Sequence, residues 1–160
     1  MNTEIEHKLL SINPNSIDTV PNRGILIKVR IVDIYDGDTF TILYMLDGTC
    51  MKTKIRLLGV DTPEIRKKKG CSDLESKAGK KIRDYLRKHM LEKIYYAKLL
   101  KHDKYGGRIV GDIYLANPEE TEEDVSLSSF LLERKLGKVY DGKKKFPWNT
   151  SELDYILSEL

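Results

Sequence analysis

The sequence predicts an α+β protein built on a five-stranded Greek-key β-barrel with three helices packed on it. Three strand-like segments come first, one amphipathic helical segment follows, and two more strand-like segments come after it. This order is typical of the oligonucleotide-binding (OB) barrel, which closes its sheet and leaves few free edges. The fold class by itself assigns no function.

The three leading strands are predicted from β-forming residues and from the turn that joins two of them. Residues 26–34 are rich in Ile and Val, and residues 39–45 alternate between apolar and polar positions. Asp47-Gly48 is a hairpin signal before a third strand over residues 51–58. The three segments should therefore pair as an antiparallel meander.

The longest helix is predicted to begin after Ser72, which forms a capping box with Glu75. Apolar residues then recur every four positions, at Leu74, Ala78, Ile82, Leu86 and Met90. Lys and Arg occupy many of the positions between them, which is typical of a helix with one buried face.

Two strands and two short helices are predicted for the rest of the chain. The strands cover residues 94–100 and 108–115. One helix covers residues 126–135, and the last begins after Asn149, with Glu152 as its capping partner.

Residues 24–160 are expected to form one domain, after a polar leader over residues 1–23. With 40 % hydrophobic and 33 % charged residues, the 160-residue chain indicates a folded protein with a real core. No apolar run is long enough to cross a bilayer, and the first residues lack the order of a secretory signal. We therefore expect an intracellular protein, cytoplasmic or nuclear, with Cys50 and Cys71 as reduced thiols.

Positive charge is concentrated in the middle of the chain, although the net charge is only +3. Residues 52–104 hold 17 Lys and Arg against 7 Asp and Glu, whereas residues 119–133 hold six acids and no base. Such an uneven basic surface suits a polyanion such as nucleic acid. For the run Arg66-Lys67-Lys68-Lys69, the alternative is a solvated face without a ligand.

Two acidic turns are candidates for a divalent metal site, because Asp38 and Asp61 offer the hard oxygens that Ca²⁺ prefers. Asp38 lies between the first two strands, and Asp61-Thr62-Pro63-Glu64 follows the third strand. The carbonyl of Thr62 is a further oxygen donor, and Glu64 is a candidate base. Taken alone, the first turn is better explained by the preference of Asp and Gly for turns. The second, taken alone, is better explained by a turn that ends the strand and leaves Glu64 in solvent.

Arg56 and Arg108 are candidates for binding phosphate, because a guanidinium group is planar and donates in a fixed fork. Side chains alternate along a strand, so Arg56 and Asp61 would point to opposite faces. A bend near Gly59 is therefore needed to bring them together. The alternative for Arg56 is a charge on the solvent face of the strand.

Aromatic and basic residues occur together at two places that suit a nucleic-acid rim. At the predicted hairpin tip, Tyr105 is placed to stack on a base and Lys104 to contact a phosphate. Tyr140 precedes the run Lys143-Lys144-Lys145-Phe146-Pro147-Trp148. The alternatives are an exposed, flexible loop at the tip and a Trp148 that seals the edge of the core.

Three motifs in this order closely resemble the staphylococcal (micrococcal) thermonuclease family. They are Asp-Gly-Asp-Thr at residues 36–39, Arg-Leu-Leu-Gly-Val-Asp-Thr-Pro-Glu at residues 56–64 and Asp-Lys-Tyr-Gly-Gly-Arg at residues 103–108. The second motif is highly specific, and the likeness extends over roughly residues 25–140. The order of strands and helices also agrees with that family's barrel.

The resemblance implies a calcium-dependent nuclease that cleaves DNA and RNA, preferably single-stranded or locally open, and leaves 3′-phosphate ends. A monomer without a membrane partner is expected. The implied calcium ligands are the side chains of Asp38 and Asp61 and the backbone carbonyl of Thr62. The implied catalytic residues are Glu64, which positions or deprotonates water, and Arg56 and Arg108, which stabilise the transition state. The implied nucleotide contacts are Lys104, Tyr105 and Tyr140.

One departure from the family pattern is an extra glycine between Tyr105 and Arg108. A one-residue slip within a strand would turn Arg108 to the other face, whereas a glycine bulge would absorb it. Two alternatives to an enzyme are a catalytically inactive OB-fold module that binds nucleic acid or protein and a purely structural interaction module. The presence of all the acids and arginines favours the enzyme.

Overall fold

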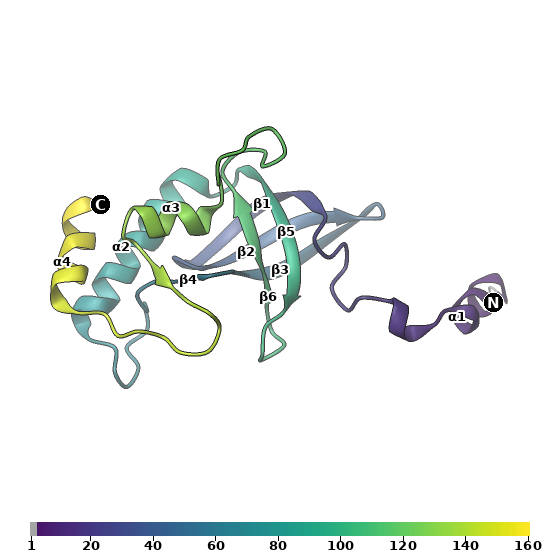
Figure 1. The fold of residues 1–160 in the computed structure, drawn as a ribbon, viewed down its shortest axis with the longest axis horizontal. Coiled ribbons are helices and arrows are strands. Elements are labelled where there is room, and N and C mark those ends of the chain that lie inside the picture. Colours follow the sequence, from purple (N-terminus) through teal and green to yellow (C-terminus); the bar gives the residue numbers. More distant parts are fainter. Residues whose placement is uncertain (1–2) are drawn as a thin grey trace.

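The computed structural model describes residues 3–160, and its centre is a closed five-stranded barrel (Figure 1). The strands follow one another around the barrel in the order β1 (Leu26–Asp36), β2 (Thr39–Leu46), β3 (Thr49–Leu57), β6 (Ile109–Tyr114) and β5 (Ile94–His102). Neighbouring strands are antiparallel except β3 and β6, which are parallel. The predicted fold class is therefore confirmed.

The barrel interior is filled by apolar side chains that alternate along the strands. Ile31, Phe40, Ile42, Ile55 and Ile113 are fully buried. In β6 the pattern of buried and half-buried residues alternates strictly, as expected for a strand with one face in a core. This core gives the loops at the strand ends a rigid support.

Three helices pack near one another at one side of the barrel: α2 (Asp73–Met90), α3 (Leu127–Glu133) and α4 (Thr150–Glu159) (Figure 1). Asn149 and Glu152 form the predicted capping box of α4. At α2 the side chain of Ser72 caps the helix, but Glu75 departs from the prediction. Its Oε1 accepts a hydrogen bond from the amide of Glu64 instead, at 3.1 Å, so the start of the helix is joined to the Glu64 loop.

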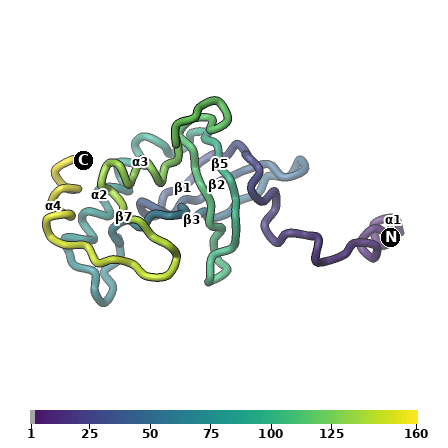
Figure 2. The backbone as a smooth tube through the Cα atoms, viewed as in Figure 1, coloured from purple at the N-terminus to yellow at the C-terminus, as the bar shows by residue number. Residues whose placement is uncertain are grey.

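The N-terminal segment contains a helix, α1 (Thr3–Ser11), and a 3₁₀ turn, η1 (Pro14–Ser16), where the sequence had indicated only a polar leader. None of the residues of α1 is buried, and the helix lies away from the barrel (Figure 1). Helix α1 and the C-terminus lie at opposite ends of the part of the molecule that the structure describes (Figure 2). The segment attaches to the barrel through Val20, which is 3 % exposed. No helix within residues 3–160 is both long and apolar enough to cross a membrane.

A second, two-stranded sheet was not predicted. Its strands are β4 (Val60–Asp61) and β7 (Lys138–Val139), which are antiparallel. The amide of Tyr140 then donates to the carbonyl of Gly59 at 3.1 Å. This pairing brings the segment after residue 140 against the turn that follows β3.

Gly79 lies where α2 packs directly on the backbone of the Glu64 loop. A Cβ atom there would lie 2.5 Å from the carbonyl oxygen of Pro63 and 3.0 Å from that of Glu64. Replacing Gly by Ala inside a helix normally stabilises it by about 0.5–1 kcal/mol. Here we expect Gly79→Ala to lower the free energy of unfolding by about 1–3 kcal/mol, because the backbone has to move.

Urea unfolding, followed by circular dichroism, measures this change. Lys80→Ala, at an exposed position on the same helix, is the matched control. A Gly79→Ala protein at least as stable as the wild type would contradict this close packing of α2 on the Glu64 loop.

Candidate active site

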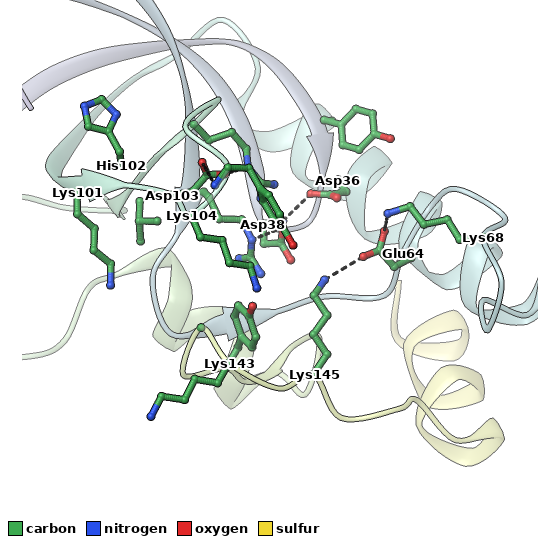
Figure 3. Close-up of a pocket in the computed structure, with 17 residues that line it drawn as sticks. Asp36, Asp38, Glu64, Lys68, Lys101, His102, Asp103, Lys104, Lys143 and Lys145 are labelled. Carbon is green, nitrogen blue, oxygen red and sulfur yellow. Dashed lines mark hydrogen bonds and ion pairs between the residues drawn. The ribbon is translucent and has the colours of Figure 1, made fainter.

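The candidate site is an open pocket of about 710 Å³ (Figure 3). It is lined by the end of β1 and the turn after it, by β3, by the β5–β6 hairpin and by residues of two loops, 64–68 and 140–145. The residues predicted from the sequence that line it are Asp38, Arg56, Glu64, Lys104, Tyr105, Arg108 and Tyr140. Asp61 and Thr62 do not line it, and they are buried, at 5 % and 2 % exposure.

Arg56 joins the two predicted metal-binding carboxylates. Its Nε lies 3.3 Å from Asp38 Oδ1, and its Nη2 lies 3.5 Å from Asp61 Oδ1. Asp38 Oδ2 also accepts hydrogen bonds from the amide and the hydroxyl of Thr62, at 3.0 and 3.1 Å. A shared guanidinium and these hydrogen bonds offset part of the cost of burying two negative charges.

A tight turn after β3 places Arg56 beside Asp61. Gly59 in this turn has a φ of 78°, in the left-handed region that glycine adopts without steric cost. Arg56 Nη1 donates to the carbonyl oxygens of Leu57, at 3.0 Å, and Val60, at 2.7 Å. The guanidinium therefore spans the turn, and the bend that the sequence requires near Gly59 is present.

Asp36 is a buried carboxyl group beside the site, where the sequence had indicated only a turn residue. Its Oδ1 accepts a hydrogen bond from the amide of Asp38, at 3.2 Å. Burial, and then the negative charge of Asp38, raise the pKa of Asp36 to about 8. Its burial follows from the pairing of β1 with β2, which sets Asp36 opposite Thr39. The Asp-Gly-Asp-Thr motif alone does not indicate this pairing. Crowded carboxylates of this kind favour a nearby cation.

The carboxylate of Glu64 is held by two lysines (Figure 3). Lys145 Nζ lies 2.9 Å from Glu64 Oε1, and Lys68 Nζ lies 3.4 Å from Glu64 Oε2. Burial would raise the pKa of Glu64, but the hydrogen bond and charge of Lys145, followed by those of Lys68, outweigh it and lower the pKa. Glu64 is therefore ionised at neutral pH, which is the form that accepts a proton from water.

Lys145 also contacts Asp61, at 2.9 Å from Oδ1. Burial alone would lower the pKa of Lys145, but its hydrogen bonds to Asp61 and Glu64 raise it. Burial raises the pKa of Asp61, and Lys145 and Arg56 offset this only in part. The sequence had indicated only that Lys145 belongs to a basic rim. The direction of its side chain toward the acids depends on the path of its loop, which the sequence pattern does not give.

Arg108 reaches the pocket, because the extra glycine lies in the hairpin tip ahead of β6, which begins at Ile109. Its Nε donates to Asp103 Oδ2 at 2.8 Å, and its Nη1 donates to Thr39 Oγ1 at 3.4 Å. The Thr39 hydroxyl donates in turn to Asp38 Oδ1 at 3.1 Å. Burial would raise the pKa of Asp103, but the hydrogen bond and charge of Arg108 outweigh it and lower the pKa.

Aromatic and basic side chains stand at the mouth of the pocket. Tyr105 is 79 % exposed, and Lys104 Nζ lies 5.3 Å from the centroid of its ring. The Arg56 guanidinium lies 5.3 Å from the centroid of the Tyr140 ring. Trp148, in contrast, is partly buried against the core, with Lys138 Nζ 4.7 Å from its ring centroid. Trp148 therefore seals the edge of the core.

The buried cluster offers carboxylate oxygens, which are the donor atoms that hard divalent cations prefer. Asp38 and Asp61 supply these oxygens around one arginine, whereas Asp36 adjoins Asp38 alone. Within residues 3–160, no three His, Cys, Asp or Glu side chains are grouped as a metal-binding cluster. A cation here would therefore need backbone oxygen and water besides two carboxylates, which is chemistry that Ca²⁺ and Mg²⁺ accept.

A search of curated proteins found no match. A family model described as staphylococcal nuclease homologue matches residues 54–156. The matched range includes Arg56, Asp61, Glu64 and Arg108, and it begins after Asp38. Because the match covers more than half of the sequence, and the barrel agrees with it, the chain belongs to the family of staphylococcal nuclease homologues.

Proposed function

We propose that this chain is a calcium-dependent nuclease that hydrolyses phosphodiester bonds of DNA and RNA and leaves 3′-phosphate ends. The observation that supports it best is the cluster in which Arg56 contacts both Asp38 and Asp61. The adjoining pocket presents Glu64 and Arg108 as well. Residues 24–160 would act as one thermonuclease-like domain.

The arginines have a clear role in this reaction. A phosphodiester is an anion, and its charge increases on the phosphoryl oxygens as a nucleophile attacks. Arg56 is held in place by two carbonyl groups and two carboxylates, so its planar fork is oriented before the substrate arrives. Arg108 is fixed by Asp103 and adds a second guanidinium on the same pocket.

Glu64 is the residue that we assign to the attacking water. It is ionised, partly buried and oriented by contacts to its amide and its carboxylate. A carboxylate in this state aligns a water molecule and accepts its proton. Asp38, Asp61 and the carbonyl of Thr62 would hold Ca²⁺, which neutralises phosphate charge when bound.

The exposed aromatic ring at the pocket mouth supports a preference for single-stranded or locally open substrates. Tyr105 is free to stack on an unpaired base, and Lys104 beside it is free to contact a phosphate. Stacking on a base needs an accessible face, which a closed duplex does not offer. Tyr140 would contact the nucleotide from the other loop of the pocket.

The purified chain is expected to degrade single-stranded DNA and RNA in the presence of Ca²⁺ and to stop when a chelator is added. The products should resist 3′ extension until a phosphatase removes the terminal phosphate. A gel assay with end-labelled oligonucleotides measures both properties.

Binding without cleavage under Ca²⁺, Mg²⁺ and Mn²⁺ would favour the alternative, a catalytically inactive OB-fold module that binds nucleic acid or protein. Cleavage that persists in chelator would contradict the role of the cation. Products that extend without phosphatase treatment would contradict the assigned position of bond breakage.

A further inference from the structure

Lys145 occupies an unusual place for a surface lysine, because its ammonium group lies between two acids to which the proposed function gives different roles. Its Nζ is 2.9 Å from Asp61 Oδ1 and 2.9 Å from Glu64 Oε1. The Asp61 side chain is only 7 % exposed, whereas that of Lys145 is 46 % exposed. The lysine therefore reaches from a solvent-accessible loop to a buried carboxylate.

The loop that carries Lys145 is attached to the fold on both sides of this residue. Before it, the amide of Tyr140 donates to the carbonyl of Gly59 at 3.1 Å. After it, Lys138 Nζ donates to the carbonyl of Pro147 at 2.9 Å, and Asn149 caps α4. In Figure 3, Lys145 points toward Glu64, whereas Lys143 points away from the acids. Of these two lysines, Lys145 is the one directed toward the acids.

We propose that Lys145 is a positioning residue whose ammonium group competes with the divalent cation for Asp61. This inference rests on the proposed function, in which Asp61 is a metal ligand. Both cations need the lone pairs of the same carboxylate, and two positive centres at hydrogen-bond distance from one carboxylate repel each other. In the metal-free protein, Lys145 supplies the positive charge that keeps Asp61 and Glu64 close together.

The ammonium group has an attractive neighbour in its pocket besides the two acids. In its position beside Asp61 and Glu64, Lys145 Nζ already lies 5.9 Å from the centroid of the Tyr140 ring, a distance at which an aromatic ring attracts a cation. Its partial exposure and four-carbon stem allow it to move without displacing the backbone. Glu64 keeps a second cation, Lys68, when Lys145 leaves. The exchange therefore leaves no acid without a positive neighbour.

Isothermal titration calorimetry of Ca²⁺ against the full chain tests this competition. Lys145→Met removes the charge and keeps a similar volume, and it is expected to bind Ca²⁺ about fivefold more tightly than the wild type. Lys145→Arg retains the positive charge and should restore an affinity close to the wild-type value. Lys144→Met removes an adjacent exposed lysine that does not line the pocket, and it should leave the affinity unchanged.

An unchanged or weaker Ca²⁺ affinity in Lys145→Met would overturn the proposed competition. An equal gain of Ca²⁺ affinity in Lys144→Met would also overturn it, because the effect would then come from the loss of any nearby positive charge. A cleavage assay of the same proteins separates a failure of the competition from a failure of the proposed function. Active wild-type protein with no gain in Lys145→Met overturns the competition alone. Wild-type protein that neither binds a divalent cation nor cleaves overturns both.

Discussion

Replacement of Glu64 by Gln is expected to lower the turnover number by about 10²–10⁴-fold, the range that a general base contributes. Gln is nearly the same size and keeps one oxygen, but it carries no charge and does not accept a proton from water. A steady-state cleavage assay with a single-stranded oligonucleotide at saturating Ca²⁺ measures the turnover number. Binding of the same oligonucleotide, followed by fluorescence anisotropy, should stay close to the wild-type value.

One contact that holds the Glu64 loop does not depend on the carboxylate, so the substitution tests chemistry rather than folding. Glu64 uses its backbone amide to bond Glu75, and Gln retains that amide. Glu133→Gln, at an exposed position on α3, controls for the substitution itself and should cleave like the wild type. Equal turnover in Glu64→Gln and wild type would show that another group activates the water.

Replacement of Arg56 by Lys is expected to lower the rate of cleavage by about 10²–10³-fold, as for the loss of one well-placed donor to a developing charge. Lysine keeps the positive charge but has a single nitrogen at its end. It therefore cannot bond the carbonyls of Leu57 and Val60 and at the same time meet Asp38 and Asp61, as the guanidinium does. Single-turnover cleavage measures the effect on the chemical step.

Arg30→Lys is the matched control, because Arg30 lies half-exposed on β1 and pairs with Glu92 away from the pocket. Thermal unfolding of both variants without metal separates a loss of catalysis from a loss of structure. A rate for Arg56→Lys within a few-fold of the wild type would show that charge alone is sufficient, and that the orientation of the guanidinium has no role in the reaction.

Local sequence patterns were sufficient to predict individual strands of the barrel and its longest helix. Alternation in residues 39–45 and the Asp47-Gly48 turn predicted β2 and the hairpin, and apolar spacing predicted α2. These features depend on neighbours along the chain, so the sequence carries them directly. The resemblance to a nuclease family was confirmed by the family match. The roles given to individual site residues stay predictions.

The features that the sequence did not reveal depend on contacts between distant segments. The inward turn of Lys145 toward Glu64 joins residues 81 positions apart. The β4–β7 pair consists of two residues on each side, which is too short for a periodic pattern. Glu75 fits a capping box by spacing, but tertiary contact redirected its side chain. The helix α1 buries none of its residues, so no apolar face indicated it strongly.

The bond between Glu75 and the amide of Glu64 has a consequence for the motions of the protein. A second bond, from the Ser76 hydroxyl to the carbonyl of Ile65 at 2.7 Å, joins the same two segments. Both partners belong to the first turn of α2, and the ends of helices open more readily than their centres. When that turn frays, the loop that carries Glu64 loses both of these hydrogen bonds at once. Transient opening at a helix end would therefore disturb the position of Glu64, and with it the proposed reaction, while the barrel itself stays closed.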